Sequence, residues 1–210
     1  LGLGGELRSV TGVLPSVLAA KSSNCTVMLP EANLAEATLV EGASLLATES
    51  LIQAAAHLSG SVPIAEQTGG QSPLQPKERS VGRDLGDVCG QSFGVRSLEI
   101  AAAGGHSLMM VGPPGCGKTM LAERLAGILP DMTSSEALAT AAVYSVSHLG
   151  FDSRYWQRRP FRAPHHSASA AALVGGGPRV TPGEISLAHN GVLFLDELTE
   201  FSRHVLDQLR

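Results

Sequence analysis

Short apolar runs alternate with helix-like segments along the first 58 residues of the chain. The short runs predict strands, and the longer segments between them predict helices, one of which has Pro15 near its first turn. Strands that are separated by helices predict an α/β layer. The expected strands are residues 5–10, 25–29 and 43–47. The expected helices are residues 13–21, 30–39 and 50–60.

The pattern is interrupted at residues 59–80, which carry three prolines and several Gly and Ser residues without periodicity. This composition predicts a linker. A second α/β unit is then expected, with a helix over 91–105, an apolar strand at 106–111 and an amphipathic helix over 118–129. The expected division is a first domain at 1–58, the linker at 59–80 and a second domain at 81–210.

Two capping-box patterns predict further helix starts. Thr133 with Glu136 predicts a helix over 134–147. Thr181 with Glu184 predicts a short helix that ends before the last apolar run of the chain. Between these boxes, the glycines at 175–177 predict an exposed hairpin.

Composition excludes several classes of protein. With 43% hydrophobic and 16% charged residues, the 210-residue chain has the composition of an ordinary globular protein with one large or two small domains. A net charge of −4 argues against a generally basic nucleic-acid binder. Cys25, Cys89 and Cys116 are scattered, which favours free thiols in a reducing compartment, and we expect a cytoplasmic protein. There is no apolar run of membrane-spanning length, and the start at Leu1 suggests part of a longer protein.

The stretch GPPGCGKT matches the phosphate-loop pattern G-x-x-x-x-G-K-[ST]. Glycines let successive backbone N–H groups point into one concavity, and the following helix presents its positive end to phosphates. Lys118 is expected to reach the β- and γ-phosphates of ATP, and the Thr119 hydroxyl to bind Mg²⁺. The alternative is an ordinary Gly/Pro turn. The candidate nucleotide-binding residues are Gly112, Pro113, Pro114, Gly115, Cys116, Gly117, Lys118 and Thr119.

Two adjacent acids follow the apolar run at 192–195, which predicts a strand buried on both faces. Ligands of open α/β sheets bind at the carboxyl ends of the strands, where these acids lie. We expect Asp196 to hold Mg²⁺ through water and Glu197 to polarise the attacking water. The alternative is a strand that runs into a solvated turn.

A stretch at 153–167 combines arginines with aromatic residues and contains no acid. Arginines and aromatics together suit contact with single-stranded DNA, through the backbone and by base stacking. The alternatives are an insert packed against the next subunit, or arginines paired with the protein's own acids. A metal site at His165 and His166 is disfavoured, because adjacent histidines are expected to point apart and no Cys or carboxylate accompanies them. The candidate DNA-contacting residues are Arg154, Arg158, Arg159 and Arg162, interleaved with Tyr155, Trp156 and Phe161.

Four blocks of the chain resemble the AAA+ ATPases of the magnesium-chelatase-like, ComM/YifB type. They are DLGDVCGQ, LEIAAAGGHSLMMVGPPGCGKTMLAERLAGILP, RPFRAPHHSASAAALVGGG and PGEISLAHNGVLFLDELTEF. The chain departs from the family at Cys116, where Thr is usual, at Gly86, where Ala is common, and at Thr199, where Pro is usual. None of these departures removes an expected phosphate or metal contact.

The resemblance implies a partial Lon-protease-like (S5-type) α/β domain at 1–58, followed by an incomplete three-layer α/β core of an AAA+ P-loop NTPase. Leu14 stands where Lon proteases carry their catalytic lysine, so a peptidase is disfavoured. In the family's strand order, both neighbours of the 106–111 strand come later in the sequence. The arginine finger that completes the family's active site would also lie beyond Arg210, so we expect weak hydrolysis by this chain alone.

The resemblance further implies a ring, expected to be a hexamer, that couples ATP hydrolysis to movement on DNA, as in branch migration during natural transformation. One alternative is a chelatase-type ATPase subunit that acts on a protein partner. Another is a regulatory nucleotide-binding module that does not hydrolyse ATP.

Overall fold

The structure is a computed structural model, which describes residues 1–70, 84–177 and 180–209. The chain divides into two compact units. The first contains residues 1–75 and 138–156, and the second contains residues 76–137 and 157–210. The first unit therefore takes up residues 138–156 in addition to the expected N-terminal region, and α6 (Ser134–Val146) contributes residues to both units.

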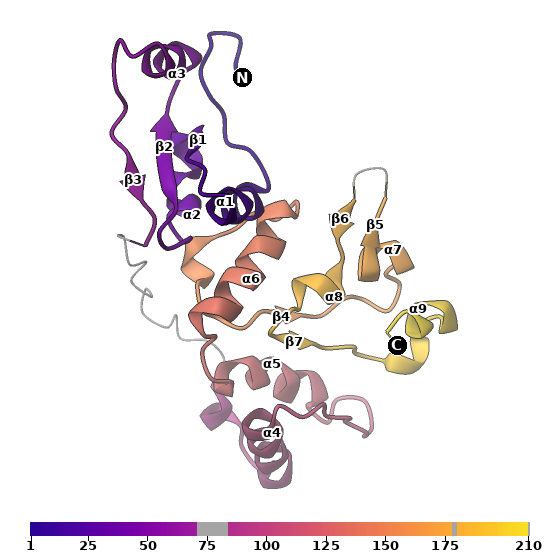
Figure 1. Cartoon of the computed structure of the whole chain (residues 1–210). Coiled ribbons are helices and arrows are strands. Elements are labelled where there is room, and N and C mark those ends of the chain that lie inside the picture. The colour runs from indigo at the N-terminus through magenta and orange to yellow at the C-terminus, as the bar shows by residue number, and fades with distance from the viewer. Residues whose placement is uncertain (71–83, 178–179, 210) are drawn as a thin grey trace. The chain divides into compact units, whose positions relative to one another are not determined.

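The first unit is a small α/β layer, as the alternating pattern predicts (Figure 1). Its three-stranded sheet has the order β1-β2-β3, in which β1 and β2 are parallel and β3 is antiparallel. The strands are β1 (Val27–Pro30), β2 (Ser44–Thr48) and β3 (Gln67–Thr68). The helices are α1 (Val13–Ser22), the short η1 (Glu31–Asn33), α2 (Leu34–Ala37), α3 (Leu51–Leu58) and η3 (Ser153–Tyr155).

Two details of this unit differ from the expectation. Residues 5–10 form no strand and contribute only an isolated bridge between Glu6 and Ser50. The first part of the expected linker joins the sheet, because β3 pairs with β2. Residues 71–80 of that linker lie outside the described part of the chain.

Small and branched apolar residues fill the core of the first unit. Leu14 and Val17 of α1 pack there with Leu29 of β1 and Leu45 of β2, and the side chains of Leu14, Val17 and Leu45 have no exposed surface. Ala141 of α6 belongs to the same cluster. Burying these side chains accounts for the helix-on-sheet arrangement.

Helices dominate the second unit, together with two small two-stranded sheets (Figure 1). A parallel pair joins β4 (Phe161–Arg162) to β7 (Val192–Leu193), and an antiparallel pair joins β5 (Gly175–Gly176) to β6 (Thr181–Pro182). The helices are η2 (Leu85–Asp87), α4 (Ser92–Gly104), α5 (Lys118–Ile128), the start of α6, α7 (Ala170–Val174), α8 (Glu184–Leu187), η4 (Leu198–Glu200) and α9 (Arg203–Asp207).

Two apolar clusters hold this unit together. One joins α4 to α5 through Leu98 and Leu121, and the other joins α7 to α9 through Leu173 and Val205. The helices start and stop largely where the sequence predicts. α4 ends at Gly104 with Gly105 in the left-handed conformation (φ 62°), and Thr133 and Glu136 make both hydrogen bonds of a capping box at the start of α6.

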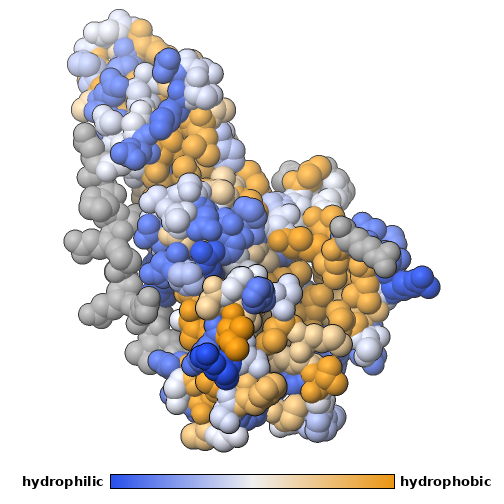
Figure 2. Space-filling view, turned by 60° about the horizontal axis from the view of Figure 1, so that its bottom comes forward, coloured by the Kyte–Doolittle hydropathy of each residue, from blue (hydrophilic) through white to orange (hydrophobic). Residues whose placement is uncertain are grey.

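The expected strand at 106–111 is not formed, and its residues have no regular structure. The side chains of Met109 and Val111 are 79% and 85% exposed. A strand needs a partner to satisfy its backbone groups, and none of the described residues pairs with this segment. Figure 2 shows apolar patches on the surface of the second unit. Its most exposed large apolar side chains are Phe93, Met109, Val111 and Val180.

Two further predictions about this unit need correction. Val192 and Leu193 are only half-buried, so β7 is not covered on both faces. The expected capping box at Thr181 does not form: Thr181 belongs to β6, Gly183 caps α8, and the Glu184 carboxylate pairs with Arg162. The hairpin expected at 175–177 is present as the β5–β6 pair.

Candidate functional site

The glycine-rich loop leads directly into α5, whose N-terminal end carries no side-chain cap. Gly117 occupies the cap position with φ 87°, and Gly115 has φ 75°, both in the left-handed region that favours glycine. A bulkier residue there would be strained. The first turn of α5 therefore presents backbone N–H groups that no side chain of the loop satisfies, which is the arrangement that binds anions.

Lys118, the first residue of α5, folds its side chain back over this loop. Its Nζ donates hydrogen bonds to the carbonyl oxygens of Gly112 and Pro113, both at 3.0 Å, and lies 3.9 Å from Cys116 Sγ. The ammonium group thus lies against the backbone that would surround a phosphate.

The next residue meets the first of the two acids. Thr119 Oγ1 donates a hydrogen bond to Asp196 Oδ2 at 2.9 Å. The other carboxylate oxygen, Asp196 Oδ1, accepts the backbone N–H of Glu197 at 3.0 Å. Two side-chain oxygens that are 77 positions apart in the chain are therefore adjacent, and oxygen atoms are the ligands that Mg²⁺ prefers.

The second acid, Glu197, lies beside the pair but points elsewhere. Its backbone is left-handed (φ 51°), and its side chain is 64% exposed, with Oε2 3.3 Å from His166 Nδ1. Left-handed conformations of non-glycine residues are uncommon and cluster at functional sites. Asp196 and Glu197 thus lie in the turn that follows β7, and the side chain of Glu197 contacts His166.

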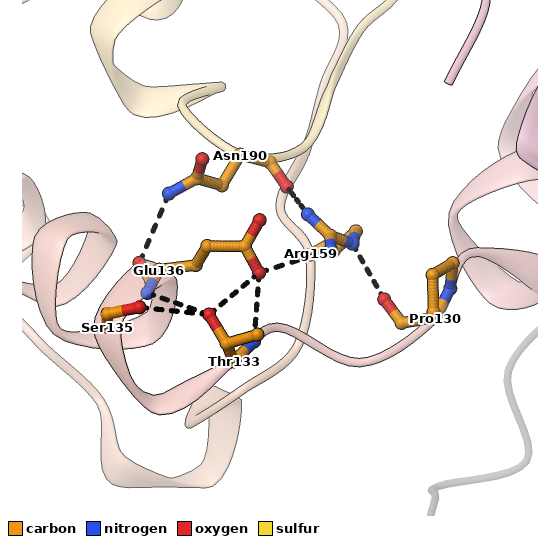
Figure 3. Close-up of polar contacts among 6 residues, drawn as sticks. All are labelled: Pro130, Thr133, Ser135, Glu136, Arg159 and Asn190. Carbon is orange, nitrogen blue, oxygen red and sulfur yellow. Dashed lines mark hydrogen bonds and ion pairs between the residues drawn. The ribbon is translucent and has the colours of Figure 1, made fainter. Parts of the chain in front are cut away.

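The strand that leads to the acids is positioned by Arg159 (Figure 3). Its guanidinium donates to the carbonyl oxygens of Pro130 at 2.6 Å and Asn190 at 2.8 Å, and lies 3.4 Å from Glu136 Oε2. Asn190 in turn donates from its side chain to the Glu136 carbonyl at 3.1 Å. These contacts connect the start of α6 with the residues that precede β4 and β7.

The Glu136 carboxylate has two kinds of partner in this network. It accepts hydrogen bonds from the backbone N–H of Thr133 at 2.9 Å and from its hydroxyl at 3.1 Å, besides the contact with Arg159. These partners favour the charged form, so the pKa of Glu136 is lowered, with the Thr133 backbone hydrogen bond as the largest cause.

Two of the arginines considered for DNA contact are engaged within the protein. Arg159 serves the network above, and Arg162 binds Glu184 with two hydrogen bonds of 2.6 Å. Both guanidinium groups are mostly shielded, with side-chain exposures of 17% and 27%. This corresponds to the alternative in which arginines pair with the protein's own acids. Arg154 differs, because it pairs with Asp152 on the surface and is 70% exposed.

Aromatic residues of the same stretch also pack within the protein. Trp156 meets Phe151 edge-on in the first unit, with ring centroids 6.3 Å apart. Phe161 stacks on Phe194 in the second unit, at 6.1 Å. Of the three aromatics considered for base stacking, only Tyr155 is largely exposed, at 61%.

The expectation that His165 and His166 point apart is wrong. Their ring centroids lie 4.0 Å apart with an interplanar angle of 38°, so the two rings lie side by side. His165 contacts Ser167 and His166 contacts Glu197. No group of three or more metal-ligating side chains occurs among the described residues.

One loop contact was not anticipated from the sequence. Gln91, at the start of α4, donates from Nε2 to the carbonyl oxygen of Cys116 at 2.8 Å. The two residues are 25 positions apart, and no periodic pattern or spacing rule connects them. In the sequence, Gln91 is the last residue of the block DLGDVCGQ, which does not indicate a contact with the loop.

Comparison with known proteins gives a consistent picture. Residues 84–210 match the family described as magnesium chelatase, subunit ChlI. Over the whole chain, the sequence is 49% identical to competence protein ComM of Haemophilus influenzae and 47% identical to the uncharacterized protein YifB of Escherichia coli. It spans 42% and 41% of the lengths of those two relatives. It is also 29% identical over 136 residues to Lon protease 2 of Bacillus subtilis, which covers 61% of this chain and 24% of that protein.

No helix in the described part of the chain combines the length and the apolar character needed to cross a membrane.

Proposed function

Because the chain belongs to the magnesium chelatase subunit ChlI family, whose members are ATPases of the AAA+ type, we propose that it carries the Mg-dependent ATP-binding and hydrolysis site of such an ATPase. The observation that carries the proposal is the 2.9 Å contact between Thr119 and Asp196. It joins the end of the phosphate loop to the acid pair, which is the juxtaposition that a magnesium-bound triphosphate requires.

Each residue then has a defined task. The backbone N–H groups around Gly117 bind phosphate oxygens, and Lys118 adds a positive charge in place of its present carbonyl partners. Thr119 and Asp196 would hold Mg²⁺, which when bound neutralises charge that develops on the phosphates. Glu197 orients the attacking water once its side chain turns from His166 towards the nucleotide.

We also propose that the first unit is a Lon-like domain without peptidase activity. Supporting this, Leu14, which by the resemblance takes the place of the Lon catalytic lysine, is buried in the apolar core with no exposed surface. An apolar buried side chain cannot activate a nucleophile. The ATPase domain is proposed to follow from residue 81, and self-association into a ring, as a hexamer, completes its active site with groups from a neighbouring subunit.

For the target of the motor, we propose DNA, on the similarity to competence protein ComM. A second candidate is a protein partner remodelled without DNA contact. It is favoured by the internal engagement of Arg159 and Arg162, which leaves fewer cations of the 153–167 stretch for a phosphate backbone. Stimulation of the full-length protein's ATPase by single-stranded DNA supports the first candidate. ATPase activity indifferent to DNA but raised by a protein partner supports the second.

The ATPase proposal is tested by thermal unfolding with and without Mg-ATP. Ligand at about 100 times its Kd stabilises a protein by about 2.7 kcal/mol. Lys118→Ala should abolish most of this stabilisation, since it removes the cation from the loop. Arg96→Ala is a matched control, because Arg96 is an exposed cation on α4 that forms its ion pair with Glu99. An Mg-ATP shift that is equal in the wild type and Lys118→Ala argues against the proposed site.

A further inference from the structure

Gln91 connects the start of α4 to the phosphate loop. Its side-chain nitrogen Nε2 donates a hydrogen bond of 2.8 Å to the carbonyl oxygen of Cys116, and the contact is partly buried. It occupies the N-cap position of α4 but makes no side-chain capping bond there. Its amide is therefore directed at the loop and not at its own helix.

The direction of this hydrogen bond determines where the next N–H points. The carbonyl of Cys116 and the N–H of Gly117 belong to one planar peptide unit, and no cis peptide bond occurs among the described residues. In a trans peptide, the C=O and the N–H point in opposite directions. By holding the Cys116 carbonyl, Gln91 turns the Gly117 N–H away from itself.

Gln91 also lies close enough to restrict the loop sterically. A Cβ atom at Gly117 would lie 2.8 Å from Gln91 Nε2, closer than real Cβ contacts occur. The amide of Gln91 therefore lies directly against Gly117. The hydrogen bond and the close approach act in the same direction.

The support for Gln91 does not depend on the loop itself. Arg124 of α5 donates to the carbonyl oxygen of Asp84 at 2.9 Å, which ties the segment before α4 to the middle of α5. A Cβ at Gly94 would lie 2.9 Å from Leu121 Cδ1, so the two helices are in close contact near Gln91. The amide is therefore carried by a packed helix pair and can impose an orientation on the loop.

We propose that Gln91 is a positioning residue for polyphosphate binding, which fixes the Cys116–Gly117 peptide so that its N–H faces the phosphates. The proposal deepens the ATPase function proposed above and rests on it. Since a backbone N–H binds the phosphates of substrate and of transition state alike, loss of the positioning contact raises KM and leaves kcat nearly unchanged.

The test compares Gln91→Met and Gln91→Glu with the wild type in the full-length protein. Methionine is neutral and similar in length but cannot donate, whereas glutamate keeps the shape and places an acceptor against the Cys116 carbonyl. Ser97→Ala is the control, because it removes a hydrogen bond within α4, from Ser97 Oγ to the Phe93 carbonyl, that does not reach the loop. Affinity is measured for Mg-ATP and for Mg-tripolyphosphate, which lacks base and sugar.

We expect Gln91→Met to weaken both ligands about tenfold, which corresponds to about 1.4 kcal/mol, and Gln91→Glu to weaken them more. KM for ATP should rise by a similar factor with kcat within about twofold of the wild type, and Ser97→Ala should change neither constant. The amide signal of Gly117 should shift in NMR spectra when tripolyphosphate is added to the wild type, and should shift less in Gln91→Met.

Two results overturn the inference. Unchanged tripolyphosphate affinity in both Gln91 variants shows that the loop does not need the contact. Weaker ATP binding with normal tripolyphosphate binding shows that Gln91 acts on the nucleoside. A wild type that binds neither ligand refutes the proposed ATPase function itself, and is thereby distinguished from a failure at Gln91.

Discussion

Thr119 Oγ1 donates a hydrogen bond to Asp196 Oδ2 at 2.9 Å, across 77 positions of the chain. Thr119 is the second residue of α5, and Asp196 follows β7. The contact therefore depends on how the helix after the phosphate loop is placed against the strand that carries the acids. Both side chains offer oxygen atoms that can serve as metal ligands. Together they form the part of the candidate site that can bind a hard cation.

Removing the Thr119 hydroxyl should weaken magnesium binding. For Thr119→Val we expect the Mg²⁺ concentration needed for nucleotide-dependent stabilisation to rise about 10–100-fold, since a metal ligand and an orienting partner of Asp196 are both lost. Thr119→Ser keeps the hydroxyl and should stay close to the wild type. The measurement is a Mg²⁺ titration of the thermal shift at fixed ATP. Equal titration curves for the valine and serine variants would contradict the role.

Glu197 should be needed for ATP turnover but not for ATP binding. Glu197→Gln should keep ATP binding, because the side chain of Glu197 contacts His166 and not the phosphate loop. It should lower turnover by about 10²–10⁴, the usual contribution of a general base. Glu200→Gln is a suitable control, since Glu200 is an exposed acid in the η4 turn that follows. ATP binding and steady-state hydrolysis are measured on the full-length protein, and wild-type turnover in Glu197→Gln would remove the proposed base.

Arg159 should matter for stability. Arg159→Ala leaves the Pro130 and Asn190 carbonyls without their donor and removes the ion pair with Glu136. The expected loss in the free energy of unfolding is about 2–3 kcal/mol. Arg154→Ala, at an exposed ion pair, should cost less than about 1 kcal/mol. Urea unfolding of both variants tests the difference, and equal midpoints would show that the network in Figure 3 contributes little.

The sequence predicts local elements here better than their partners. The helices around Leu98 and Leu121 follow from the periodicity of their apolar residues, and the cap at Thr133 follows from a pattern of four residues. The strand expected at 106–111 fails, because its hydrogen bonds must come from elsewhere and pattern alone does not supply them. The pairing of strand residues 161–162 with 192–193 is likewise not predicted by the sequence pattern, since it joins distant segments.

For the candidate site, the motifs predict which residues carry the chemistry, and the structure adds how they are supported. Long-range contacts decide whether an arginine is available for a ligand. Arg154 and Arg162 both belong to the basic-aromatic stretch, and each pairs with an acid. The side chain of Arg162, paired with Glu184, is 27% exposed, whereas that of Arg154, paired with Asp152, is 70% exposed. Gln91 has no sequence signature of its own, because its role depends on the direction of one peptide group in a loop 25 residues away.

The Glu136 network should make the second unit sensitive to acid. The hydrogen bond from the Thr133 backbone, with help from Arg159, lowers the pKa of Glu136 below its ordinary value of 4.5, so the folded state binds its proton less readily than the unfolded state. This carboxylate therefore contributes stability that is fully present above about pH 4.5 and is lost as the pH falls through the lower, folded pKa.

Glu136→Gln should destabilise the protein at neutral pH, and its difference from the wild type should shrink as the pH falls below 4.5. Ser135→Ala, which removes a hydroxyl beside Thr133 but leaves the carboxylate in place, is the control and should keep the acid dependence of the wild type. Urea midpoints measured between neutral pH and pH 3 test this, and parallel curves for the wild type and Glu136→Gln would mean that the carboxylate is not selectively stabilised in the folded state.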